Sequence, residues 1–199
     1  NIKTKNLENT ITKICERSKK ASRILSLAST KEKNNALKLV YESISDNKKF
    51  ILEQNLKDLE LAHKLKPKSA LLDRLKLNSE RVDQICKSIK TVIGLPDPVG
   101  KKFDKWDRPN GLKISKIKVP LGVICIIYES RPNVTADVSS LCIKSGNCSI
   151  LRGGKESFYS STALIKSIHQ GLKVSKVPAD TVQSLPTSSR DAVDILLKM

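Results

Sequence analysis

The stretch VPLGVICIIYESRPNVTADVSSLCIKSGNCSILRGGKES, residues 119–157, determines the fold class of this 199-residue chain. Its apolar run at residues 122–128 suits a strand that is buried on both faces of a sheet. A helical pattern follows over residues 134–144 and ends before Gly146, and residues 149–152 form a second apolar run. A strand, a helix and another strand in this order predict a parallel βαβ unit.

The same alternation continues towards the end of the chain. Residues 157–172 have a helical pattern, residues 181–185 suit a third strand, and Ser188-x-x-Asp191 is a capping pattern that begins another helix. We therefore expect the α/β class, with a doubly wound, Rossmann-like parallel sheet. Ligands of such sheets bind at the carboxyl ends of the strands. The functional loops should be residues 128–134, 152–157 and 186–190.

The first half of the chain has a helical period from Leu7 to about Gly94. Ser29 and Glu32 form a capping box that begins one helix, and Asn78 can cap another. The apolar stripes expected to face the core are Ile11, Ile14, Ile24, Leu25 and Ala28, then Leu37, Val40, Tyr41 and Ile44, then Leu52, Leu56, Leu59 and Ala62, then Val82, Ile85, Ile89 and Val92.

A boundary between two kinds of structure is predicted at residues 95–111, which are rich in turn-forming residues. Residues 112–119 then have a β-type mixture of branched and basic side chains. The chain is accordingly divided into an N-terminal helical segment, residues 1–111, and an alternating α/β part, residues 112–199.

The net charge of +17 raises the possibility of nucleic-acid binding. The charge is spread, however, with 25 basic and 14 acidic residues in residues 1–111, and 12 basic and 6 acidic residues in residues 112–199. We see no basic tail or stripe, and the three Phe, three Tyr and one Trp are too few for an aromatic stacking surface. A Lys-rich solvated surface is the preferred interpretation, and we expect no nucleic-acid partner.

The five cysteines are odd in number and form no CxxC pair, so we expect buried, reduced thiols. His63 and His169 lie far apart in the sequence without companion ligands, so no metal site is expected.

No apolar run approaches the roughly 18 to 20 residues of a membrane span, and the polar start has no signal-peptide core. We expect a cytoplasmic protein without a membrane partner. Because the chain starts at Asn1 and stops at Met199 within a helical pattern, we expect a fragment.

The loop after the first apolar strand carries four functional candidates within six residues: Tyr128, Glu129, Arg131 and Asn133. The amide of Asn133, at the start of a helix, suits the stabilisation of an oxyanion. Arg131 could pair with a phosphate or a carboxylate through two hydrogen bonds. A structural interpretation has equal weight, in which Asn133 caps the helix and Arg131 forms an ion pair with Glu129.

The loop after the second strand combines glycines, basic residues and a helix start. Gly153 and Gly154 would let backbone amides approach an anion, and a helix N-terminus favours phosphate. Arg152 and Lys155 could hold the 2′-phosphate of NADP, and Glu156 could instead accept a hydrogen bond from a ribose hydroxyl. A plain strand-to-helix turn is the alternative, because neither the GxGxxG nor the Walker A spacing is present.

A third candidate pair, Ser188 and Ser189, precedes the last predicted helix. These residues could bind a nucleotide phosphate, although N-capping of the helix is the simpler interpretation.

Residues 119–157 resemble the signature region of the γ-glutamyl phosphate reductases, a branch of the aldehyde dehydrogenase superfamily. The resemblance extends to LLDRLKLNSERVDQI (71–85) and LPDPVG (95–100), and more loosely to KASRILSLASTKEKNNALKLV (20–40). It therefore covers nearly the whole chain.

The resemblance implies NADPH-dependent reduction of L-glutamyl 5-phosphate to L-glutamate 5-semialdehyde with release of phosphate, in proline biosynthesis. It implies an N-terminal helical segment that wraps an incomplete NADPH-binding part, a catalytic cysteine in a later domain that this chain lacks, and a homo-oligomer at full length. Asn133 matches the oxyanion asparagine of the superfamily. Arg152 matches the basic residue that faces the adenosine ribose, with Gly153, Gly154, Lys155 and Glu156 completing the cofactor loop. Glu129 and Arg131 are assigned to the substrate. The glycine-rich third phosphate loop of many relatives is replaced here by TSSR, residues 187–190.

Two alternatives remain open at this stage. The chain could be the reductase module of a bifunctional pyrroline-5-carboxylate synthase. It could instead be a basic nucleic-acid-binding protein, which would show a steep loss of duplex affinity with salt.

Overall fold

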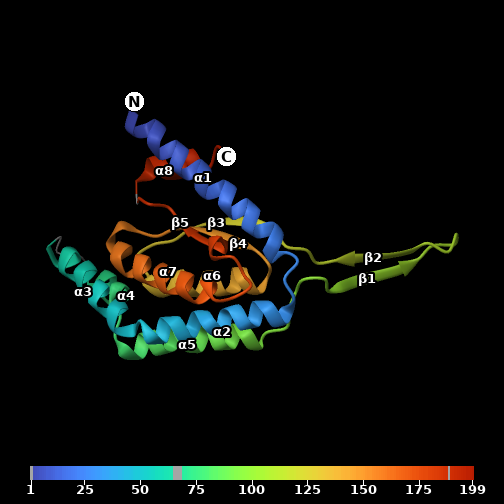
Figure 1. Ribbon diagram of the computed structural model, residues 1–199, viewed down its shortest axis with the longest axis horizontal. Coiled ribbons are helices and arrows are strands. Elements are labelled where there is room, and N and C mark those ends of the chain that lie inside the picture. The colour runs from blue at the N-terminus through green and yellow to red at the C-terminus, as the bar shows by residue number, and fades with distance from the viewer. Residues whose placement is uncertain (1, 65–68, 188) are drawn as a thin grey trace.

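The computed structural model describes residues 2–64, 69–187 and 189–199 and shows a central sheet between layers of helices (Figure 1). In chain order the helices and strands are α1 (Ile2–Leu25), α2 (Thr30–Asp46), α3 (Lys48–Lys64), α4 (Ser69–Leu75), α5 (Ser79–Gly94), β1 (Lys102–Asp107), β2 (Lys113–Ile117), β3 (Val123–Ile127), α6 (Pro132–Lys144), β4 (Cys148–Arg152), the 3₁₀ turn η1 (Lys155–Ser157), α7 (Phe158–Lys173), the 3₁₀ turn η2 (Ala179–Thr181), β5 (Val182–Ser184) and α8 (Arg190–Leu196).

The predicted parallel sheet is confirmed. β3, β4 and β5 pair in that order, and both pairings are parallel. The crossover helices α6 and α7 lie on one face of this sheet, and α1 covers the other face (Figure 1). The carboxyl ends of the strands therefore meet at one edge, where residues 128–134, 152–157 and 185–187 emerge.

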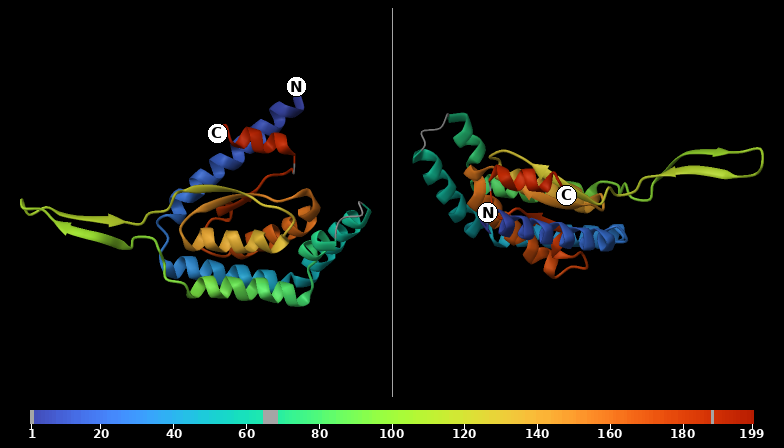
Figure 2. Two further views of the ribbon diagram at one scale, coloured as in Figure 1. Left: turned by 180° about the vertical axis from the view of Figure 1, so that it is seen from behind. Right: turned by 90° about the horizontal axis from the view of Figure 1, so that it is seen from above.

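The helices α2 and α5 form a further layer beneath α6 and α7 (Figures 1 and 2). The predicted caps are present: Ser29 and Glu32 form the capping box of α2, and Asn78 accepts a hydrogen bond from the backbone of Arg81 at the start of α5. Gly171 allows α7 to approach α2 closely, because a Cβ atom there would lie 2.6 Å from the Leu39 carbonyl oxygen. Close helix packing thus joins the N-terminal helices to the sheet layer.

The buried face of α3 differs from the predicted one. Leu56 is 58% exposed, whereas the buried residues of this helix are Ile51, Asn55, Asp58 and Ala62. The prediction holds for Ala62 and for Leu52, which packs against the core, but it was wrong for Leu56. The observed buried face carries a carboxylate and an amide that bind another helix, as described below. In α1, similarly, Ile24 is exposed while Ile11, Ile14 and Leu25 are buried.

The LPDPVG segment between α5 and β1 has a structural role. Its Asp97 carboxylate lies 2.5 Å from Nζ of Lys33, which is almost completely buried on α2. Asp97 also accepts hydrogen bonds from the Thr30 hydroxyl, at 2.7 Å, and from the Val99 amide, at 2.9 Å. Although burial opposes ionisation of Asp97, these donors and the Lys33 charge outweigh it and lower the pKa of the carboxyl. The segment thereby ties the end of α5 to α2.

An antiparallel hairpin of β1 and β2 projects from the body of the molecule (Figure 2). β1 occupies residues that were predicted as part of a turn-rich boundary, and that part of the prediction was wrong. The whole of β1 is exposed, including the aromatic rings of Phe103 and Trp106. Residues 101–118 contain seven basic and two acidic residues, so positive charge is concentrated on the hairpin. The separate charge counts for residues 1–111 and 112–199 did not reveal this concentration.

The strand β3 is less buried than predicted. Cys125 and Ile127, on one face of the strand, are exposed, and β3 is an edge strand that pairs only with β4 in the described part of the chain. All five cysteines are free, as expected. Cys86, Cys142 and Cys148 are buried, but Cys125 is exposed and Cys15 is only partly buried, so the expectation of buried thiols holds for three of the five.

Candidate functional site

A groove of about 680 Å³ lies at the carboxyl edge of the sheet, between the loops that follow β3 and β4. This volume is within the range of roughly 300–1,000 Å³ that is typical of small-molecule sites. The groove is lined by Leu71, Ile127, Tyr128, Glu129, Ser130, Arg152, Gly154, Lys155 and Glu156. Of the predicted site residues, it therefore brings together Glu129, Arg152, Gly154, Lys155 and Glu156, and Gly153 adjoins them in the chain.

The two glycines allow close packing against the neighbouring loop. A Cβ atom on Gly153 would lie 3.2 Å from the Tyr128 hydroxyl oxygen. A Cβ atom on Gly154 would lie 2.8 Å from Oε2 of Glu156 and 3.0 Å from Oγ of Ser130. The backbone of Gly154 has φ −62°, an ordinary value, so the reason for glycine at that position is space and not a left-handed conformation.

Glu156 holds this loop against the loop after β3. Its Oε2 accepts a hydrogen bond from the Ser130 hydroxyl at 2.8 Å, and Ser130 is buried. Lys155 is exposed at the start of η1, so its ammonium group can reach a ligand in the groove. The arrangement thus combines a fixed carboxylate with a solvent-facing cation.

The start of α7 is already occupied by a carboxylate of the protein. Asp58 on α3 accepts hydrogen bonds from the backbone amides of Tyr159, at 3.1 Å, and Ser160, at 2.7 Å, and from the Ser160 hydroxyl. These two amides are therefore already used within the protein, and the binding of a cofactor phosphate near this helix N-terminus stays a prediction. Burial raises the pKa of Asp58, and the three hydrogen bonds partly offset that effect.

Asn55, one turn before Asp58, extends the same buried network. Its amide nitrogen donates to the Leu75 carbonyl and to the Ser160 hydroxyl, both at 2.9 Å, and its oxygen accepts from the Leu77 amide at 2.8 Å. The network therefore fixes α3, the end of α4 and the start of α7 relative to one another. The glycine loop leads directly into this fixed helix start.

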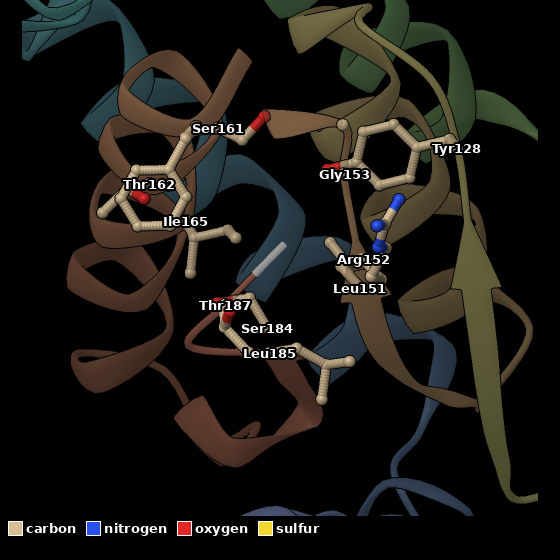
Figure 3. A pocket seen from close by; sticks show the side chains of 12 residues that line it. Tyr128, Leu151, Arg152, Gly153, Ser161, Thr162, Ile165, Ser184, Leu185 and Thr187 are labelled. Atoms are coloured by element: carbon tan, nitrogen blue, oxygen red, sulfur yellow. The ribbon is translucent and has the colours of Figure 1, made fainter. Parts of the chain in front are cut away.

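A second, much smaller pocket lies between the tips of β4 and β5 and helix α7 (Figure 3). Tyr128, Arg152 and Gly153 lie on one side of it, and Ser161, Thr162 and Ile165 of α7 lie on the other (Figure 3). Its volume of about 30 Å³ holds a few water molecules at most, so a nucleotide cannot be placed there. Burial raises the pKa of the Tyr128 hydroxyl, which lies 2.7 Å from the Thr135 hydroxyl.

The loop after β5 contributes Leu185 and Thr187 to this small pocket. Ser189 caps α8, since its hydroxyl accepts a hydrogen bond from the Asp191 amide at 3.2 Å. This is the simpler role considered from the sequence, and the binding of a nucleotide phosphate by Ser189 stays a prediction. Ser188, the other predicted residue, lies outside the described residues.

Arg131 and Asn133 do not line the groove. They line a separate pocket together with residues of α4 and α5. Asn133 does not cap α6, because the N-cap position is Arg131 and the Asn133 amide instead donates to Asp137 at 3.0 Å. Within the described ranges, no ion pair joins Arg131 to Glu129. Both structural interpretations of this loop are therefore wrong.

None of the thiols is activated. Burial raises the pKa of all five cysteines, to about 11 for Cys142 and Cys148. A thiolate nucleophile needs the opposite shift. In the part of the chain that the structure covers, no group of three His, Cys, Asp or Glu side chains could hold a metal ion. None of the described helices is long and apolar enough to cross a membrane.

The fold has counterparts among aldehyde dehydrogenases. A probable aldehyde dehydrogenase from Listeria monocytogenes superimposes with a TM-score of 0.74 at 13% identity, over 99% of this chain and 41% of that chain. An identity this low concerns the fold alone. Together with the parallel sheet and the groove at its carboxyl edge, this likeness defines the class: the chain has an aldehyde dehydrogenase-like fold.

Closer relatives specify the family. The γ-glutamyl phosphate reductase of Paramagnetospirillum magneticum is 47% identical over 193 residues, which are 97% of this chain and 46% of that protein. Two solved γ-glutamyl phosphate reductases match as well. That of Thermotoga maritima has a TM-score of 0.89 and 41% identity, over 92% of this chain and 44% of that chain. That of Saccharomyces cerevisiae has a TM-score of 0.83 and 32% identity, over 90% of this chain and 46% of that chain. No family model matches the chain. The chain is a relative of the γ-glutamyl phosphate reductases and spans about half the length of the curated relatives it matches.

Proposed function

We propose that this chain is the NADPH-binding part of a γ-glutamyl phosphate reductase, which reduces L-glutamyl 5-phosphate to L-glutamate 5-semialdehyde and releases phosphate in proline biosynthesis. In this proposal residues 112–199 form the cofactor-binding part and residues 1–111 wrap it. The observation that carries the proposal is the groove at the carboxyl edge, where the family's basic and glycine residues gather. The 47% identity to a γ-glutamyl phosphate reductase supports it.

The residues of the groove fit a phosphorylated dinucleotide. Arg152 and Lys155 supply cations for the 2′-phosphate, and Gly154 lets the loop pack against Ser130 and Glu156 at the edge of the groove. Glu156 uses Oε2 for Ser130, which leaves Oε1 for a ribose hydroxyl. When bound, NADPH supplies the hydride for the reduction. Any role of Ser188 and Ser189 in binding the cofactor belongs to the same proposal.

The loop after β3 is proposed to serve the substrate. The Asn133 amide nitrogen has two hydrogens and gives one of them to Asp137, so the other can stabilise an oxyanion. Arg131 and Glu129 are exposed on the same loop and can contact a small charged substrate. The catalytic thiolate would come from outside this chain, because burial disfavours ionisation of all five thiols here.

The test of the cofactor site is an NADPH titration of Lys155→Ala. Loss of one charge-assisted hydrogen bond should weaken binding by roughly ten- to a hundredfold, since such bonds contribute about 1.5–3 kcal/mol. NADH, which lacks the 2′-phosphate, should show little change. Lys173→Ala is the matched control, because Lys173 is exposed at the far end of α7. Unchanged NADPH affinity in Lys155→Ala would remove this assignment.

We also propose that the projecting hairpin meets a second copy of the chain in a homo-oligomeric enzyme. Phe103 and Trp106 are each 39% exposed on it and are the type of side chain that interfaces bury. Sedimentation should detect a larger species that Trp106→Ser dissociates.

One observation favours the nucleic-acid alternative, namely the concentration of seven basic residues on the same hairpin. Titration with duplex and single-stranded DNA at low salt separates the two possibilities. The reductase proposal predicts no binding there, whereas a nucleic-acid-binding protein would bind and lose affinity steeply as salt increases.

A further inference from the structure

The separate pocket that Arg131 and Asn133 line has a volume of about 260 Å³ and adjoins the cofactor groove. The same two segments, α4 and the loop after β3, contribute to both sites. The residues that line this pocket are Asp73, Arg74, Lys76, Leu77, Arg81, Gln84, Arg131 and Asn133. A molecule bound in it would therefore lie next to a molecule bound in the groove.

The pocket has an excess of positive charge, with four cationic side chains and one carboxylate in its lining. The carboxylate is already used. Asp73 forms an ion pair with Arg81 at 2.8 Å, and the same guanidinium also donates to the backbone carbonyls of Asp73 and Lys76. Arg81 therefore holds the turn between α4 and α5 in place and neutralises Asp73.

Three cations are left for a ligand. Arg74, Lys76 and Arg131 are exposed, and none of them forms an ion pair with any residue the structure describes. They come from α4, from the turn after it and from the N-cap position of α6. Like charges that converge on one pocket repel one another, and an anion bound between them would remove that repulsion.

We infer that this pocket binds an anionic group of the substrate, a phosphate or a carboxylate, through Arg74, Lys76 and Arg131, with Arg81 as a positioning residue. The inference rests on the proposed function, because a glutamyl phosphate carries both anionic groups. The loop after β3 then separates the substrate from the cofactor, and Asn133, in the first turn of α6, lines the substrate side. This geometry brings the predicted oxyanion donor to the substrate and not to the dinucleotide.

The experiment is a pair of NMR titrations of the chain, one with inorganic phosphate and one with L-glutamate, monitored at the amides of Arg131 and Asn133. We expect saturable shifts with at least one of the two probes. Arg74→Gln combined with Arg131→Gln should weaken that binding by roughly tenfold or more, because two charge-assisted hydrogen bonds are lost. The matched control is Lys102→Gln combined with Lys105→Gln, which removes the same charge from the hairpin and should leave the affinity unchanged.

Each outcome has a defined meaning. Binding of phosphate identifies the acyl phosphate end as the ligand, and binding of glutamate alone identifies a carboxylate. No saturable shift with either probe, or an equal loss in the hairpin control, would overturn the inference. Arg131→Lys checks the fold, since it keeps the charge, and circular dichroism of each variant reports unfolding directly. NADPH affinity is measured in parallel: if NADPH binds normally while the pocket binds neither probe, the inference fails and the proposed function stands.

Discussion

The loops that follow β3 and β4 leave the same edge of the sheet but are held very differently. The loop after β4 is fixed on several sides: Gly153 and Gly154 pack against the neighbouring loop, Glu156 binds Ser130, and the helix that follows is capped by Asp58. The loop after β3 shares the Ser130 hydrogen bond, but its Glu129 and Arg131 side chains are exposed, and the Asn133 amide donates to Asp137, one turn further along α6.

This difference indicates a division of labour. A loop that is ordered before the ligand arrives loses little conformational entropy on binding, which suits the cofactor that every turnover uses. A loop with free cations gains its contacts only when an anion arrives. We therefore expect changes beneath the β4 loop to affect folding strongly, and changes at the exposed residues of the β3 loop to affect binding with little effect on stability.

The largest effect is expected for Asp58→Ala. The substitution leaves the amides of Tyr159 and Ser160 buried without an acceptor, so the free energy of unfolding should fall by about 2–4 kcal/mol. Urea denaturation measures this loss. Glu60→Ala, on the exposed side of the same helix, is the control and should change stability by less than about 0.5 kcal/mol.

Asp58→Asn tests the cause of that loss. Asparagine can still accept a hydrogen bond, so its cost should be smaller than that of alanine. Because burial raises the pKa of Asp58, the folded protein holds this proton more tightly than the unfolded chain does, and wild-type stability should fall as pH rises from about 4 through the raised pKa. The Asn variant lacks this contribution. Identical pH dependence of the two proteins would contradict this account.

A smaller effect is expected for Gly154→Ala. The new methyl group would displace Glu156 from Ser130, at a cost of about 1 kcal/mol in unfolding free energy for one lost hydrogen bond, and should weaken NADPH binding severalfold. Ser130→Ala removes the same hydrogen bond without the steric effect. Gly94→Ala serves as the control, because nothing lies within 4 Å of a Cβ atom there. Equal NADPH affinities for the two glycine variants would show that the loop tolerates displacement.

The smallest effect on stability is expected for Asn133→Ala. The side chain is exposed, so the change in unfolding free energy should stay within about 0.5 kcal/mol. Asn55→Ala, the same substitution in the buried network, should cost several times more. The comparison between the two loops would fail if both asparagine substitutions destabilised the protein equally in urea.

Local signals in the sequence predicted a large part of this fold. The capping box of Ser29 and Glu32 and the cap at Asn78 depend on residues three positions apart, which a single sequence displays fully. The order of strands and helices from β3 onward likewise predicted that the loops after β3 and β4 meet at one edge.

The features that were not predicted depend on distant partners or on the absence of a core. Asp58 acts on α7, a hundred residues away, and its only local sign is the helical spacing with Ile51, Asn55 and Ala62, two of which are apolar. β1 has no buried face, so its sequence KFDKWD shows no apolar side to detect. The separation of Asn133 from the groove results from the position of α4, which the sequence pattern does not specify.

The placement of α1 across the back of the sheet has a consequence for biosynthesis. Ile11 and Ile14 pack with Ile150, Leu185 and Ala192, so this part of the first helix finds its partners only after a long further stretch of the chain has been made. At about 5–20 residues per second, the ribosome takes on the order of ten to forty seconds to bridge that interval. Throughout that interval the apolar side of α1 stays uncovered, so we expect chaperones to bind the nascent chain.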